Sequence, residues 1–98
     1  MQELILIEPG NTANAEWTRQ AERSAVRREF EERLADSSAL AYRVARGVLR
    51  KDADAEDVAQ ESLLRAFRNF ARLRDRNRFR AWLVRISFRL ALDRLRAG

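Results

Sequence analysis

The side chains of this sequence that could do chemistry fall into two groups of opposite charge. The first group lies in the stretch "DAEDVAQESLLRAF", residues 54–67, where Gln60 and Glu61 stand three and four residues after Asp57. Side chains at this spacing share one face of a helix. Carboxylates and a carboxamide on one face can pair with arginines and main-chain groups of another helix. The stretch is therefore a candidate protein-binding surface.

The second group is a block of arginines in the C-terminal third of the chain. Residues 1–64 hold 9 basic and 13 acidic side chains, a net charge of −4. Residues 65–98 hold 11 arginines and 2 aspartates, a net charge of +9. A basic block of this kind is typical of proteins that bind a polyanion, most often nucleic acid. The alternative interpretation is a solvated helix face.

Four of these arginines would form a row on the last predicted helix. Their spacing places them within about 40° of one another around the helix axis and along about 27 Å of its length. A row of fixed cations suits a phosphate backbone, because each neutralised phosphate releases counterions. The row consists of Arg78, Arg85, Arg89 and Arg96.

The elements that position both groups are predicted to be helices. Pro9 is the only proline, glycine occurs three times, and alanine, leucine, arginine and glutamate dominate, all of which favour helix. We expect an all-α fold, a small bundle of about four helices with a long C-terminal helix. Residues 1–14 would be a flexible N-terminal tail and residues 15–98 one helical domain. The helices are expected at about 15–35, 38–50, from 54 onward and 79–96, with breaks at Asp36–Ser38 and at the loop "RLRDRNR".

Apolar residues at helical spacing predict which faces are buried. A separate apolar strip on the last helix is expected to pack against another helix. It consists of Phe88, Leu92 and Leu95. The residues expected in the core are Leu40, Val44, Val48, Ala59, Leu63, Ala66, Phe67, Phe70, Phe79, Leu83, Ile86 and Leu90, with Trp82 beside them. Either Ser37 or Ser38 is expected to cap the second helix, and Asp54 the third.

Composition argues against several function classes. The chain has no cysteine and no histidine, so it lacks the residues of the usual zinc sites, and it contains no glycine-rich phosphate loop. We expect no enzyme activity, no metal, no cofactor and no small-molecule substrate. No segment approaches the roughly 20 apolar residues of a membrane span, and no signal-peptide pattern opens the chain. A cytoplasmic protein without membrane contact is expected.

Two motifs at this spacing resemble the second conserved region of bacterial sigma factors, especially the extracytoplasmic-function group. The resemblance covers roughly residues 25–97. The first motif is acid-x-x-Gln-Glu, formed by Asp57, Gln60 and Glu61. The second is an aromatic residue followed by Trp-Leu and Arg-Ile, formed by Phe79, Trp82, Leu83, Arg85 and Ile86.

The resemblance implies that the acidic helix docks on the β′ clamp of RNA polymerase. Asp57, Gln60 and Glu61 would make the polar contacts, with Leu64 and Phe67 as apolar support. The geometry of a helix is compatible with this role, because Asp57, Gln60, Glu61 and Leu64 share the side opposite much of the predicted core stripe.

The resemblance also implies that the loop and the last helix recognise the promoter −10 element and help to separate its strands. The loop, Leu73 to Arg78, would form a pocket for a flipped base of the non-template strand. Arg74, Arg76 and Arg78 would supply charge there, and Asn77 would bond a base edge. On the helix, the residues expected to meet DNA are Val84, Arg85, Ser87 and Arg89, whereas Phe79 and Trp82 are expected to be core.

Two departures and one rival interpretation accompany the resemblance. Arg89 stands where many relatives have asparagine, which leaves base preference at that position open. The sequence ends at Gly98, so the helix-turn-helix domain that reads the −35 element is expected to be absent. The rival is a helical protein-interaction module that binds an acidic partner, such as an anti-sigma factor, without reading DNA. A helix-turn-helix repressor fits the acidic helix poorly.

Overall fold

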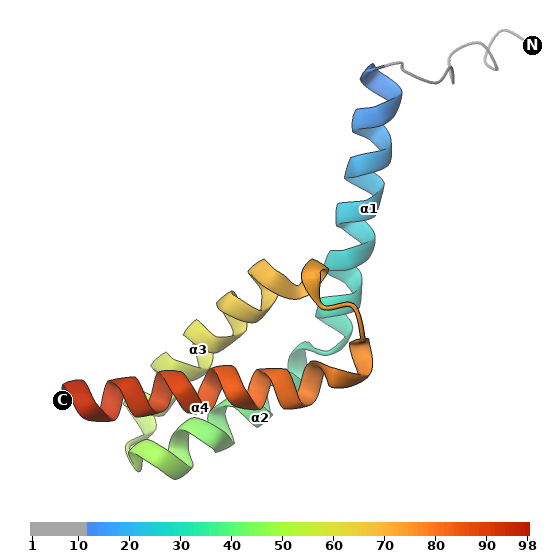
Figure 1. Cartoon of the computed structure of the whole chain (residues 1–98). Helices are drawn as coiled ribbons and strands as arrows, with labels where there is room; N and C mark the ends of the chain where they lie inside the picture. The colour runs from blue at the N-terminus through green and yellow to red at the C-terminus, as the bar shows by residue number, and fades with distance from the viewer. Residues whose placement is uncertain (1–11) are drawn as a thin grey trace, which may run out of the picture.

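The structure is a computed structural model that describes residues 12–98 (Figure 1). Over those residues the chain forms α-helices and short 3-10 helices without strands, which confirms the predicted all-α bundle with a long C-terminal helix. The tail predicted over residues 1–14 lies outside the described residues as far as residue 11, and residues 12–14 belong to the first helix. The elements are α1 (Thr12–Glu32), α2 (Leu34–Leu49), α3 (Asp52–Asn69), η2 (Phe70–Arg72), η3 (Arg76–Arg78) and α4 (Phe79–Ala97).

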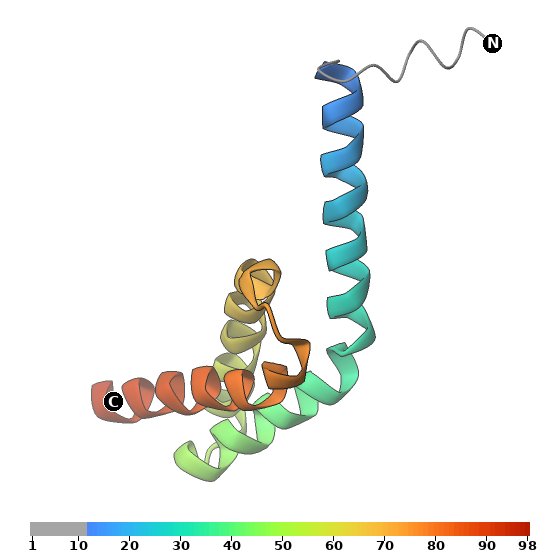
Figure 2. The same ribbon diagram turned by 45° about the vertical axis from the view of Figure 1, so that its right-hand side comes forward.

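Three helices make the body of the domain, and the first helix projects from it. Helix α2 packs against both α3 and α4, which also pack against each other. Helix α1 meets the body only near its C-terminal end, where it contacts α2 and η2, and the rest of it rises away from the bundle (Figures 1 and 2). The principal extents of 64 × 23 × 21 Å reflect this projection.

A cluster of phenylalanine rings joins α1 to the body. Phe30, near the end of α1, has its ring centroid 5.4 Å from that of Phe70 and 6.0 Å from that of Phe79. Phe70 and Phe79 are 5.4 Å apart and meet edge to face. Such aromatic pairs contribute about 0.5–1.5 kcal/mol each beyond the area they bury. The cluster therefore fixes the end of α1, the end of α3 and the start of α4 together.

Small side chains line the other end of the core. Ala45 of α2, Ala55 of α3 and Ala91 of α4 are completely buried, and Leu49 and Val58 beside them are nearly so. The distance between packed helices is set by the side chains at their contact. Alanines at these positions let the three helices approach closely where no large ring separates them.

Two helix boundaries differ from the sequence prediction. Helix α1 ends and α2 begins at Arg33, not at the expected Asp36–Ser38 break, and the Arg33 guanidinium lies over the rings of Phe70 and Phe79 at 5.5 and 5.8 Å. Ser37 is buried inside α2, so it does not cap that helix. Helix α3 begins at Asp52 after the N-cap residue Lys51, which corrects the prediction that Asp54 caps it.

The predicted buried faces are partly confirmed. Leu40, Phe70, Phe79 and Leu83 are buried as expected, and so are Ala59 and Ala66. Val44 and Val48 are only half-buried, because α2 turns Ala41, Ala45 and Leu49 toward its neighbours. The strip expected to pack against another helix is wrong for two of its three residues, since Phe88 is 48% exposed and Leu95 52% exposed.

Candidate functional site

The outer face of α3 carries the acid and amide group singled out from the sequence. Asp57 and Gln60 are exposed, Glu61 is half-buried, and Leu64 is 49% exposed. Their inward-facing neighbours Val58, Ala59, Ser62 and Ala66 are buried. The 3.6-residue repeat of the helix thus separates a packed side from a polar side, and the predicted residues lie together on the polar side. We call Asp57, Gln60, Glu61 and Leu64 the α3 outer face.

Both carboxylates of this face, Asp57 and Glu61, have partners within the chain. Arg94 of α4 bonds Asp54 at 3.0 Å and Asp57 at 3.2 Å. Glu61 bonds Arg65 at 3.2 Å, four residues along the same helix. The side-chain carboxamide of Gln60 has no hydrogen-bonding partner among the residues that the structure describes. Exposed pairs of this kind contribute little to stability, so these side chains can exchange partners readily.

Phe67 lies at the margin of this face and not within it. Its ring centroid is 5.2 Å from that of Phe30, which places it against α1, and 39% of the residue stays exposed. The sequence suggested both a core role and a supporting role in docking for Phe67. The structure gives it a packing contact on one side and an open surface on the other.

Arg76 holds the loop between α3 and α4. Its Nε and Nη2 donate to Glu29 of α1 at 3.1 and 3.2 Å, and its Nη1 donates to the main-chain carbonyls of Leu73 and Phe70. The guanidinium also stacks 4.2 Å from the centroid of the Phe70 ring. The hydrogen bond from Arg76 lowers the pKa of the Glu29 carboxyl below its usual value. Arg76 was expected to present its charge to DNA, and its guanidinium is instead used inside the protein.

The remaining polar residues of the loop face solvent. Arg74 is exposed and forms no ion pair with any described residue. The Asn77 main-chain N–H donates to Asp75 Oδ1 at 3.0 Å, which starts the short helix η3 and leaves the Asn77 carboxamide free. Arg78 lies 3.8 Å from Asp75, and its side chain is 81% exposed. The side chains of Arg74, Asn77 and Arg78 therefore have donors that face solvent.

The arginine row of α4 is also available. Arg85, Arg89 and Arg96 are exposed, and none of them is paired with a carboxylate of residues 12–98. Arg94, which is not part of the row, makes the bonds to Asp54 and Asp57. The positive charge predicted along this helix is thus not cancelled by the protein's own acids.

Two other residues of α4 that were predicted to contact DNA, Val84 and Ser87, are partly or completely buried. Ser87 is completely buried and its Oγ has no hydrogen-bond partner, so the prediction that it meets DNA is wrong. Ser87 points into the bundle because it stands four residues after Leu83 and four before Ala91, both fully buried. Val84 is half-buried and packs against the aromatic core, which leaves only part of it for a contact.

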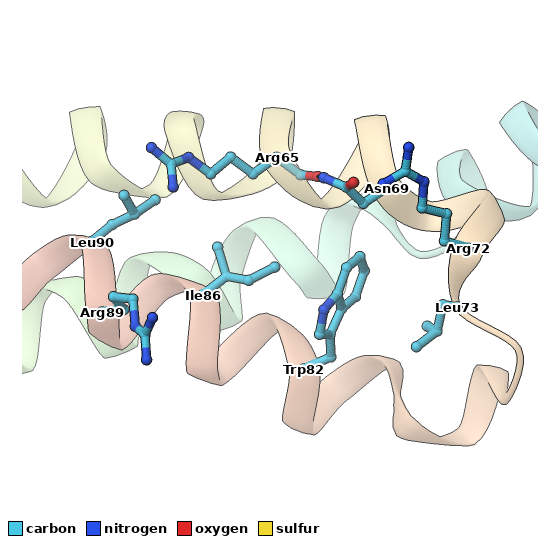
Figure 3. A pocket seen from close by; sticks show the side chains of 8 residues that line it. All are labelled: Arg65, Asn69, Arg72, Leu73, Trp82, Ile86, Arg89 and Leu90. Carbon is cyan, nitrogen blue, oxygen red and sulfur yellow. The ribbon is translucent and has the colours of Figure 1, made fainter.

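A cavity of about 410 Å³ opens between the end of α3 and α4, beside the loop (Figure 3). Trp82 lines it while packing on Phe79, with ring centroids 6.0 Å apart. The sequence prediction missed the wall formed by Arg65 and Asn69 of α3 and Arg72 of η2, although Arg65 and Asn69 stand four residues apart and so share a helix face. The lining residues are Arg65, Asn69, Arg72, Leu73, Trp82, Ile86, Arg89 and Leu90.

Within the described residues, no helix is long and apolar enough to cross a membrane, and no group of three acidic side chains is placed to hold a metal ion. Searches of curated proteins and of solved structures each found no match to this chain. The model of the sigma-70 region 2 family does match, over residues 35–98. That segment contains α2 except its first residue, α3, the loop and α4. Because it makes up more than half of the chain, the protein belongs to the sigma-70 region 2 family, whose members act in promoter recognition and RNA polymerase binding during transcription initiation.

Proposed function

We propose that this chain is the region 2 domain of an extracytoplasmic-function type sigma factor, which docks on the polymerase β′ clamp and holds the melted −10 element. The observation that carries the proposal is the availability of two chemically different surfaces on different helices. The α3 outer face is acidic and amide-bearing, whereas the α4 row is cationic, and its members Arg85, Arg89 and Arg96 form no ion pair with a described carboxylate.

Docking would use the α3 outer face. Gln60 has both donors and an acceptor free, and Leu64 adds an exposed apolar contact beside it. The carboxylates of Asp57 and Glu61 are held by exposed arginines of the same chain, which arginines of a clamp helix could replace at little cost. Phe67 would contribute only at the margin of this surface.

The promoter strand would lie along the loop and α4. Arg85 and Arg89 would neutralise phosphates, and Arg74 and Arg78 would do the same from the loop. An unstacked base could enter the cavity beside Leu73, where the Trp82 ring offers a stacking surface of the kind used in single-strand binding. Asn77 would bond a base edge. In this arrangement Arg76 positions the loop and does not itself touch DNA.

Two pairs of substitutions test the two surfaces separately. Gln60→Ala with Glu61→Ala should reduce binding to purified β′ clamp by tenfold or more, and leave the affinity for a single-stranded −10 oligonucleotide unchanged. Arg85→Glu with Arg89→Glu should do the reverse. Unchanged clamp affinity in the first pair, or unchanged DNA affinity in the second, would refute the corresponding assignment.

A control pair separates specific contacts from net charge. Arg28→Glu with Arg43→Glu changes the charge by the same amount at exposed sites on α1 and α2 that lack an ion pair within residues 12–98. It should weaken DNA binding far less than the change at Arg85 and Arg89. If both pairs weaken DNA binding equally, the α4 row acts only as a general positive surface. The same conclusion follows if the protein shows no preference for the non-template sequence. Either result would favour the rival interpretation, a protein-interaction module that does not read DNA.

A further inference from the structure

A second groove lies between the projecting helix α1 and the end of α3, away from the cavity beside α4. Its volume is about 680 Å³. Val26 of α1, Phe67 of α3 and Ala71 of η2 give it an apolar lining. Phe67 is 39% exposed and Ala71 is also exposed, so this apolar surface is open to solvent.

The charged lining of the groove is strongly unbalanced. Arg19, Arg23 and Arg27 of α1 and Arg68 of α3 contribute four guanidinium groups, against the single carboxylate of Glu22. All four arginines are exposed, and none forms an ion pair with another residue of the described part. Exposed apolar surface is thus bordered on two helices by arginines that form no ion pair with the residues described here.

The arginines of α1 repeat at the pitch of a helix. Arg19, Arg23 and Arg27 are four residues apart, so they form one row with a step of about 6 Å. A second helix lying against α1 repeats its own side chains at the same step. Acidic side chains four residues apart on such a helix would therefore meet the arginines one by one.

We propose that this groove binds an amphipathic helix of a partner protein, with its apolar stripe against Val26, Phe67 and Ala71 and its acidic flank against the arginines. Helix-in-groove recognition combines an apolar stripe with charged flanks in this way. A nucleic-acid strand fits less well, because the apolar lining would face its phosphates and Glu22 would repel them. The same lining is acceptable to a helix, which carries both apolar and polar sides.

The groove differs from the two surfaces of the proposed function. Its α1 wall precedes residues 35–98, the segment matched by the sigma-70 region 2 family. The family match therefore gives no role to Arg19, Arg23 or Arg27. The inference depends on the geometry and charge of α1, and it would stand if the clamp or DNA assignments failed.

A synthetic helical peptide with one leucine stripe flanked by glutamates tests the proposal. Its binding to the full 98-residue chain can be followed by fluorescence anisotropy. The triple substitution Arg19→Gln, Arg23→Gln and Arg27→Gln should weaken binding about tenfold, since each exposed ion pair contributes only a small factor. Ala71→Glu, a change at an exposed position of the lining, should also weaken binding by adding a carboxylate to the lining.

The controls distinguish this groove from general attraction to a basic protein. A triple change at exposed arginines elsewhere, Arg28→Gln, Arg43→Gln and Arg80→Gln, should leave peptide affinity within about twofold. Equal losses in the two triple variants would overturn the proposal. So would equal binding of a scrambled peptide without the leucine stripe. If the groove variant instead loses affinity for a single-stranded oligonucleotide and keeps its affinity for the peptide, the groove is a nucleic-acid site and the proposal is wrong.

Discussion

Arg76→Ala tests whether one arginine organises the loop that would carry the base pocket. In the structure this side chain joins its own loop to the end of η2 and to α1, whose Glu29 is 47 residues away in the sequence. Its guanidinium bonds Glu29 of α1, caps the carbonyls of Phe70 and Leu73 at the end of η2, and stacks on the Phe70 ring. Removing it leaves the Leu73 carbonyl without its donor, leaves the Phe70 carbonyl with only the Leu73 N–H, and uncovers one face of the Phe70 ring.

The expected loss of stability follows from these contacts. The stacked guanidinium contributes about 0.5–1 kcal/mol, and the two main-chain hydrogen bonds contribute about 1 kcal/mol each. The total of roughly 2–3 kcal/mol should lower the Tm by about 10–20 °C in a domain of this size. Glu29→Gln, which removes only the carboxylate charge, should lower the Tm by less than Arg76→Ala does.

Thermal unfolding followed by circular dichroism gives the Tm, and binding of a −10 oligonucleotide gives the functional readout. The matched control is Arg74→Ala, two residues away, where the guanidinium is exposed and makes no ion pair within the described chain. Arg74→Ala should keep the wild-type Tm and lose DNA affinity. An Arg76→Ala protein that keeps its Tm while losing DNA affinity would show that this guanidinium serves DNA, and would refute the structural role argued for it.

Three further predictions concern stability. Gly47→Ala in α2 should stabilise the protein by about 1 kcal/mol, because an added Cβ meets nothing within 4 Å; a lower Tm would show that this helix face is covered. Ser87→Ala should leave both Tm and DNA affinity unchanged or slightly raised, since the buried hydroxyl has no partner to lose; reduced DNA affinity at constant Tm would mean that Ser87 is exposed. The pKa of the Glu29 and Asp52 carboxyls is lowered by hydrogen bonds from arginines, so their stabilisation is present above the unfolded pKa of about 4 and is lost as pH falls through the lower folded values. Glu29→Gln with Asp52→Asn should therefore flatten the fall in Tm below about pH 4, and an unaltered acid profile would contradict this.

The sequence predicted the helices and the buried face of the last helix because both depend on local periodicity. Phe79 and Leu83 repeat at helical spacing, and the pattern alone shows that they share a face. Helix ends were less predictable. Ser37 or Ser38 was predicted to cap the second helix. In the structure Ser37 lies inside α2, and its small side chain is buried where α2 packs against its neighbours. Serine suits both a helix cap and a tightly packed core position. The sequence alone therefore does not show which of the two a given serine occupies.

The candidate site was predictable where exposure follows from periodicity, and unpredictable where it depends on long-range pairing. Gln60 and Arg85 lie on helix faces opposite the apolar repeats, and both are exposed in the structure. Arg76 could not be distinguished from Arg74 or Arg78, since all three stand in one basic loop. Only the fold brings Glu29, 47 residues away in the sequence, within hydrogen-bond distance of Arg76. The α3 wall of the cavity was not predicted, because only the packing of α3 beside α4 brings Arg65 and Asn69 opposite Trp82.

Arg94 connects the two proposed surfaces. Its guanidinium reaches from α4 to Asp54 and Asp57 of α3 at 3.0 and 3.2 Å, so one arginine of the basic helix bonds an acid of the docking face. If a clamp arginine takes Asp57, Arg94 keeps Asp54, and α4 stays attached to α3. Docking can therefore proceed without releasing the helix that would hold DNA. With a single acid at this contact, the proposed docking would remove the ion pair between α4 and α3, and the second aspartate lets Arg94 keep one carboxylate.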